Sequence, residues 1–208
     1  MVECLSALPN LKIAAALAGA LALAGCTGAP ADDLQANQEA YRNGGYSACP
    51  SDSVSPAPGL GVYGRVQQAE DVNAIRELKF KYSRAFDAVV ADPGRIDELL
   101  ALFTDEVCVD YGLYGRFYSK SSLRYLYQYV LPTLNAWSFH VASQPIININ
   151  NGIASGSWRG VVHTVSRANY AAGPQPTFVR YDDRYQRTAS GWKFRALTVH
   201  FEAPPTGP

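Results

Sequence analysis

The hydrophobic pattern of this chain changes once, near His140, and that change restricts the fold more than any other feature. Before His140, apolar residues recur about every 3.6 positions, which is typical of amphipathic helices; after it they alternate with a period of about two, which is typical of strands. The first part predicts three helices: residues 70–90, a second that begins at the N-cap Asp92, and a third that is capped near Ser119 and stopped by Pro132.

The second part of the chain predicts two β-hairpins. The first turns at residues 150–152, Asn-Asn-Gly, because Asn and Gly tolerate positive φ. The second pairs residues 178–187 with residues 192–201, and a short strand at 107–111 precedes the third helix. Helices followed by long strands predict an α+β domain in which three helices cover one face of a strongly curved antiparallel sheet. Such a sheet closes into a cone with a pocket inside.

The first predicted helix carries an acid toward the interior of the domain. Its apolar face consists of Val72, Ile75, Leu78, Tyr82, Phe86 and Val89, and Asp87 lies near its end. An acid that points inward is either paired or functional. His140 is a candidate partner, because a carboxylate orients an imidazole and stabilises the imidazolium that forms when the ring takes a proton. The alternatives are that Asp87 ends the helix in solvent or binds nearby backbone, and that His140 is structural.

Composition excludes several classes of function. The chain has 18 basic and 18 acidic residues and no cluster of basic residues among aromatics, so no nucleic-acid partner is expected. The 3 histidines lack the spacing of metal ligands, and neither a Cys-x-x-Cys motif nor a phosphate-binding loop occurs. We therefore expect no metal and no cofactor.

The N-terminal residues predict an exported protein. Residues 11–24 join a lysine to an apolar run that has the length of a signal peptide core and is too short to span a bilayer. Leu-Ala-Gly-Cys at 23–26 resembles the bacterial lipobox, which implies a lipid anchor on Cys26 in the cell envelope. The alternative is an ordinary cleavage site that releases a soluble periplasmic or secreted protein. The resulting division is a signal peptide at 1–25, a flexible tether at 26–66, a domain at 67–203 and a tail at 204–208.

Two cysteines remain in the mature domain and tether, Cys49 and Cys108. An oxidising compartment permits a bridge between them. Cys108 stands between two valines, which is also typical of a small buried apolar residue. The sequence leaves both interpretations open.

Several short motifs, taken in order, resemble the SnoaL-like branch of the nuclear transport factor 2-like superfamily over residues 70–203. The matching segments are Ala74-Ile75-x-x-Leu78-x-x-x-Tyr82-x-x-x-x-Asp87, Leu99-x-x-Leu102-Phe103-Thr104-x-x-Val107, Phe139-His140, Asn150-Asn151-Gly152-Ile153-Ala154, Tyr181-x-Asp183-x-Tyr185 and Gly191-Trp192-Lys193-Phe194. The fold implied by the resemblance is a cone of helices around a bent sheet, in agreement with the pattern above.

The resemblance also implies an activity, because members of this branch include dehydratases, a dehydrochlorinase and polyketide cyclases. By position, His140 would remove a proton from carbon, Asp87 would orient His140, Tyr82 would polarise the departing oxygen and Arg187 would face the leaving group. His163 is a weaker match to a second catalytic histidine. The implied function is a cofactor-independent lyase or isomerase acting on a small hydrophobic molecule, either cyclic or polyketide-like.

A second function remains open, since some proteins with this fold only bind ligands or assemble with partners. Tyrosines are frequent in the middle of the chain, which suits a pocket for a flat apolar ligand or a contact with a second subunit: Tyr111, Tyr114, Tyr125, Tyr127 and Tyr129. The second hypothesis is therefore a non-catalytic binding or assembly module, and a homodimer or homotrimer is compatible with either.

Overall fold

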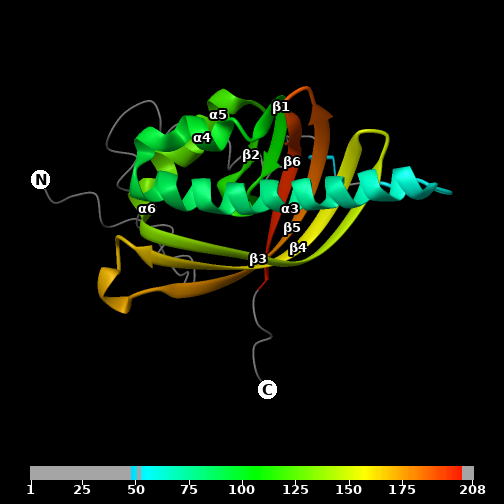
Figure 1. Ribbon diagram of the computed structural model, residues 1–208. Helices are drawn as coiled ribbons and strands as arrows, with labels where there is room; N and C mark the ends of the chain where they lie inside the picture. The colour runs from blue at the N-terminus through cyan, green and yellow to red at the C-terminus, as the bar shows by residue number, and fades with distance from the viewer. Residues whose placement is uncertain (1–47, 51–52, 203–208) are drawn as a thin grey trace, which may run out of the picture.

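A six-stranded sheet curves around one face of a long helix, α3 (Val62–Ala91), in the computed structural model of the chain (Figure 1). The structure describes residues 48–50 and 53–202. Short helical segments lie between α3 and the long strands in the chain: η1 (Pro93–Arg95), α4 (Ile96–Leu100), η2 (Gly112–Tyr114), α5 (Lys120–Arg124), η3 (Tyr125–Val130) and α6 (Leu131–Leu134). One more, η4 (Tyr170–Ala172), connects β4 to β5. The predicted α+β class is confirmed.

The sheet has the strand order β2-β1-β6-β5-β4-β3. The strands are β1 (Phe103–Asp110), β2 (Arg116–Phe117), β3 (Asn135–Asn150), β4 (Ile153–Ser166), β5 (Gln175–Thr188) and β6 (Gly191–Glu202). Both predicted hairpins form, and Asn151 and Gly152 turn the first with φ of 46° and 78°. The long strands β3 to β6 pair antiparallel as predicted, and one pairing departs from the predicted antiparallel sheet, because β1 pairs with β6 in parallel.

The core lies between α3 and the inner face of the sheet. Residues of α3 that are buried recur every three or four positions and include Ile75, Leu78, Tyr82, Phe86 and Val89. The Tyr82 ring packs against Phe103 of β1 and Phe194 of β6, with ring centroids 6.0 Å and 5.3 Å apart. These contacts fix the position of α3, and with it the position of Asp87, relative to the sheet.

An ion pair is enclosed in the same core. Lys79 of α3 and Asp183 of β5 are both fully buried, and their Nζ and Oδ2 atoms are 2.8 Å apart. Tyr185 donates a second hydrogen bond to Asp183 Oδ2, at 2.7 Å. The ammonium lies 3.7 Å from the centre of the Tyr181 ring. Burial lowers the pKa of Lys79 and raises that of Asp183, and the attraction between the two groups opposes both shifts.

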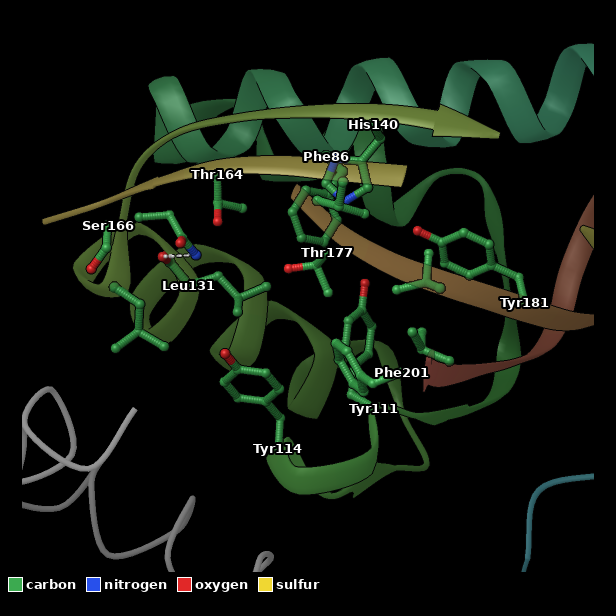
Figure 2. A pocket seen from close by; sticks show the side chains of 15 residues that line it. Phe86, Tyr111, Tyr114, Leu131, His140, Thr164, Ser166, Thr177, Tyr181 and Phe201 are labelled. Carbon is green, nitrogen blue, oxygen red and sulfur yellow. Dashed lines mark hydrogen bonds between the residues drawn. The ribbon is translucent and has the colours of Figure 1, made fainter. Parts of the chain in front are cut away.

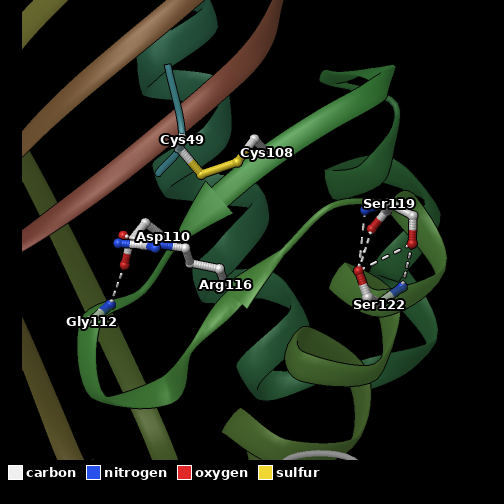
Figure 3. The surroundings of a disulfide bond; sticks show 7 residues. All are labelled: Cys49, Cys108, Asp110, Gly112, Arg116, Ser119 and Ser122. Carbon is white, nitrogen blue, oxygen red and sulfur yellow. Dashed lines mark hydrogen bonds and ion pairs between the residues drawn. A yellow bond between two sulfur atoms is a disulfide. The ribbon is translucent and has the colours of Figure 1, made fainter. Parts of the chain in front are cut away.

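The segment before α3 is attached to the domain. A disulfide joins Cys49 to Cys108 of β1, with Cα atoms 5.6 Å apart (Figure 3). Val54 N–H donates to Ser155 Oγ of β4, and Ala57 N–H donates to the Ile149 carbonyl of β3. Because strand residues alternate between faces, Cys108 points away from its buried valine neighbours and toward this segment.

The predicted boundaries near the N-terminus therefore need correction. α3 begins at Val62, inside the range predicted as tether, 26–66, and Val54 and Ala57 of that range form hydrogen bonds with the sheet. The predicted signal peptide, the predicted lipidation site Cys26 and the predicted tail at 204–208 lie outside the described residues. Within the described residues, no helix combines the length and apolarity required to cross a membrane.

The third predicted helix is confirmed at its start and extends further than expected. Ser119 and Ser122 form a reciprocal capping box, with Ser119 Oγ accepting from Ser122 N–H at 3.1 Å (Figure 3). Pro132 does not stop the helix, because it lies in the first turn of α6, which continues directly from the π-helical turn η3. Proline lacks an N–H and clashes with the carbonyl four residues earlier, and the wider π turn accommodates it.

Candidate functional site

A pocket of about 410 Å³ opens between the inner face of the sheet and the segment from β1 to α6 (Figure 2). Its walls are mostly apolar: Phe86, Leu131, Leu134, Val162, Val179, Val199 and Phe201. The polar lining residues are Tyr111, Tyr114, Asn135, His140, Thr164, Ser166, Thr177 and Tyr181. None of the described residues that line it is Lys, Arg, Asp or Glu, so the pocket suits an uncharged ligand.

His140 is the one histidine among the described residues that line the pocket, and Asp87 lies directly behind it. The Nδ1 atom of His140 is 2.6 Å from Asp87 Oδ1, and the backbone N–H of His140 donates to Oδ2 at 3.0 Å. Ser138, two residues earlier on β3, donates to Oδ1 at 2.7 Å. Phe86 packs on the imidazole, with ring centroids 4.3 Å apart. These contacts hold the ring in one orientation and assign the Nδ1 proton to the bond with Asp87.

The same contacts keep Asp87 ionised. Burial alone raises the pKa of the Asp87 carboxyl, but hydrogen bonds and charge attraction from His140, with the Ser138 hydroxyl, outweigh burial and leave the pKa below its ordinary value. A carboxylate that accepts the Nδ1 proton leaves Nε2 of His140 with a free lone pair. Since the ring lines the pocket, Nε2 is the atom available to take a proton from a ligand (Figure 2).

Asp87→Asn is expected to lower stability in a pH-dependent way. A carboxyl whose pKa is depressed by folding stabilises the native state above its unfolded pKa of about 4, and loses that contribution as the pH falls through the folded value. The free energy of unfolding should fall by about 1.5 to 3 kcal/mol at pH 7, and the difference from the unmodified protein should shrink below about pH 4. Urea titrations at several pH values measure it. A difference that is constant with pH would contradict the pairing.

Three tyrosine hydroxyls meet beside the pocket. The hydroxyl of Tyr82 is 2.6 Å from that of Tyr111 and 3.4 Å from that of Tyr127. Tyr111 lines the pocket, and Tyr181 lines it from β5. Burial is the main cause that raises the pKa of Tyr82, Tyr111 and Tyr181 well above 10, so all three stay protonated and act as neutral hydrogen-bond donors.

Tyr82 does not itself line the pocket, and the expectation that it contacts the ligand is corrected. Tyr82 and Asp87 are five residues apart, about 140° around the helix, so Tyr82 packs against Phe194 of β6 while Asp87 contacts His140 of β3. Its hydroxyl reaches the pocket only through Tyr111. The sequence marks Tyr111 only as one of several aromatic residues. Its side chain faces the pocket because it directly follows the end of β1, and this orientation has no signal in the sequence.

Arg187 is also absent from the pocket lining, and that assignment is corrected as well. Arg187 lies at the C-terminal end of β5, whereas the pocket is lined by the N-terminal half of that strand, including Thr177 and Val179. Its guanidinium forms an ion pair with Asp71 of α3 and stacks on Trp192, 4.8 Å from the ring centre. This cluster fastens the β5–β6 hairpin to the N-terminal part of α3.

His163 points to the other face of the sheet. It pairs with Phe139 of β3 and Pro176 of β5, whereas His140 pairs with Val162, which lines the pocket. The next inward residue of β4 after Val162 is Thr164. Thr164, Thr177 and Tyr181 are therefore lining residues that inspection of the sequence did not identify. Among the described residues, no cluster of three or more His, Cys, Asp or Glu side chains could hold a metal ion.

The sequence of this chain matches a known protein family. A model of the SnoaL-like domain matches residues 67–198. The chain belongs to the SnoaL-like domain family. No curated protein sequence matches it significantly.

Solved structures agree with this SnoaL-like assignment. A candidate aromatic ring hydroxylase from Novosphingobium aromaticivorans has a TM-score of 0.56 at 24% identity, covering 65% of this chain and 92% of its own. A candidate scytalone dehydratase from the same organism has a TM-score of 0.59 at 16% identity, covering 67% and 89%. A hexachlorocyclohexane dehydrochlorinase has a TM-score of 0.57 at 16% identity, covering 68% and 98%. At these identities the likeness shows the fold, that of the nuclear transport factor 2-like superfamily.

Proposed function

We propose that this SnoaL-like protein is a lyase or isomerase that abstracts a proton from a carbon atom of a neutral, hydrophobic small molecule. The observation that carries the proposal is the contact between Asp87 and His140 at the wall of an apolar pocket. Such a pair needs a dry site and a fixed ring to act as a general base, and the burial of the His140 side chain, only 5% exposed, supports both. The relatives support the fold and do not specify the reaction.

In the proposed step, Nε2 of His140 removes a proton from the carbon next to a carbonyl group. The electron pair of the broken C–H bond forms a carbon–carbon double bond, and the π pair of the carbonyl moves to the oxygen, which accepts a hydrogen bond from Tyr111. Asp87 stabilises the imidazolium. The carbonyl then re-forms. In an isomerase, another carbon takes the proton back from His140; in a dehydratase, the C–O bond of a hydroxyl on the next carbon breaks, and the hydroxyl leaves as water with the proton from His140. Tyr82 orients the Tyr111 hydroxyl in place of the direct contact predicted from the sequence.

Deuterium uptake tests the proposal without knowledge of the natural substrate. The protein is incubated in D2O with 2-tetralone, a neutral bicyclic ketone, and the label next to the carbonyl is measured by mass spectrometry. Catalysed uptake above the buffer rate is expected, and Tyr111→Phe should slow it about 10- to 100-fold by removing a hydrogen bond to the developing negative charge. Tyr129→Phe, at an exposed position outside the pocket lining, is the matched control and should have no effect.

Failure of catalysed uptake with 2-tetralone and with other neutral ketones that bind would leave the second hypothesis, a binding module without chemistry. The same result for Tyr111→Phe and Tyr129→Phe would remove Tyr111 from the mechanism. Both outcomes are readable only if the variants remain folded, which their near-UV circular dichroism reports.

We further propose that the domain is exported and anchored to the cell envelope by lipid on Cys26. The disulfide between Cys49 and Cys108 supports export, since such bonds persist in oxidising compartments. Cys26→Ser in the full chain, expressed in a bacterial host, is expected to abolish incorporation of labelled palmitate and to move the protein from the detergent phase to the aqueous phase on extraction. Unchanged labelling would contradict the lipobox assignment.

A further inference from the structure

Most hydrogen-bonding groups of the pocket lie at two separate places along its length, and the Tyr114 hydroxyl belongs to neither place. One group surrounds His140 and includes Tyr111, Tyr181 and Thr177; we call it the near pole. The other consists of Thr164, Ser166 and Asn135; we call it the far pole. In Figure 2, Thr164 and Ser166 lie on the left of the pocket, while Tyr181 lies on its right and His140 above the centre.

Strand geometry sets the distance between the poles. His140 pairs with Val162, and Thr164 and Ser166 follow Val162 on the same face of β4. At about 3.3 Å per residue, Thr164 and Ser166 lie about 7 Å and 13 Å along the strand from the position opposite His140. Asn135 pairs directly with Ser166, so these two side chains share the far end. A molecule two fused rings long would reach from one pole to the other.

The far pole has unused hydrogen-bonding capacity. The Thr164 hydroxyl has no hydrogen-bond partner in the part of the chain that the structure describes. Ser166 Oγ accepts from the Ala168 N–H at 3.2 Å, which leaves its own proton free to be donated. Asn135 Nδ2 donates a long bond of 3.4 Å to the Leu131 carbonyl, and its Oδ1 remains available as an acceptor. Between the poles the walls are mostly apolar, with Leu131, Val162 and Phe201, and Tyr114 adds a single hydroxyl outside both poles.

We infer that the pocket selects neutral, flat molecules that carry an oxygen function at both ends, one at the near pole and one held by Thr164, Ser166 and Asn135. An apolar or halogenated molecule would displace water from the far pole without replacing its hydrogen bonds. The polar groups there would be buried without partners, which weakens binding. A carboxylate would meet no cation among the described lining residues. The inference rests on the proposed function in one respect: that function identifies the ligand oxygen at the near pole as the one next to the reacting carbon. The preference for ligands with two oxygens is a property of binding and can be measured without the reaction.

Calorimetric titration of the folded protein with three probes tests the inference: 2-naphthol, 2,6-dihydroxynaphthalene and 6-hydroxy-2-naphthoate. We expect the diol to bind about tenfold more tightly than 2-naphthol, since one more buried hydrogen bond is made, and the naphthoate to bind more weakly than the diol. Equal affinity for the diol and 2-naphthol, or tighter binding of the naphthoate, would overturn the inference.

Variants locate the effect. Thr164→Val with Ser166→Ala should weaken binding of the diol about tenfold and leave 2-naphthol unchanged, whereas Ser143→Ala, at an exposed position on β3, should change neither. Equal losses for both probes would show that the far pole shapes the pocket without recognising oxygen. If the preference for the diol persists while no ketone exchanges deuterium, the inference stands and the proposed function fails. If exchange occurs without the preference, the reverse holds.

Discussion

Replacing His140 with alanine is expected to lower the rate of deuterium uptake by 2-tetralone about 10²- to 10⁴-fold while the protein remains folded. The range is the usual contribution of a positioned general base. Folding should survive because the ring is at the edge of a pocket and its removal leaves the main-chain bond from residue 140 to Asp87 in place. Loss of the imidazole also removes its packing on Phe86, so a modest decrease in melting temperature is expected.

A matched control uses the second histidine in the sheet. His163→Ala changes the same residue type on the neighbouring strand, but on the outer face, and should leave the rate unchanged. An unchanged rate in His140→Ala would refute the mechanism, because the described lining residues include no second histidine and no Asp, Glu or Lys that could replace it as the base. Equal losses in both variants would point to a general effect on the sheet.

A second large effect, on the free energy of unfolding, is expected when the buried ion pair between Lys79 and Asp183 is broken. Lys79→Met should reduce the free energy of unfolding by about 3 to 5 kcal/mol, because it leaves the buried Asp183 carboxylate without its counter-charge. The Tyr185 hydroxyl supplies only one of the hydrogen bonds that this carboxylate needs, and Asp183 Oδ1 has no partner among the described residues. Guanidinium chloride denaturation at neutral pH measures the change.

Two further variants separate loss of charge from loss of packing. Lys81→Met lies two residues further along α3, where its ion pair with Glu77 is exposed, and should change stability by less than about 0.5 kcal/mol. Lys79→Met combined with Asp183→Leu removes both charges and should recover part of the loss. If the double variant is no more stable than Lys79→Met alone, the isolated carboxylate is not the cause.

Much of the fold follows from local patterns in the sequence. The change of period near His140 identifies helices before strands, and the Asn-Gly turn fixes the first hairpin. The parallel pairing of β1 with β6 has no such signal, because the two strands are far apart in the chain and no turn links them. The length of α3 was underestimated because its first residues, from Val62, are mostly exposed and lack an apolar stripe.

Only those residues of the candidate site that have an acidic or basic side chain could be predicted from the sequence. Asp87 and His140 were predicted from the resemblance to the SnoaL-like family, together with the acid beside an apolar helix face, and the structure brings them into contact. Thr164 and Ser166 look like ordinary strand residues until the register shows which face they occupy. Lys79 could have been found, since it lies four residues after Ile75 on the buried face of α3. Catalysis, export, the lipid anchor and a homodimer or homotrimer stay predictions.

The π-helical turn before Pro132 has a consequence for comparing this chain with its relatives. A π turn holds one residue more than an α turn, so deletion of a single amino acid within residues 125–130 can be absorbed by rewinding the segment as α-helix, and the residues after it keep nearly the same orientation. Leu131 and Leu134, which form one wall of the pocket, would then still face the ligand. Relatives with a one-residue gap at this point are therefore expected to keep this wall of the pocket.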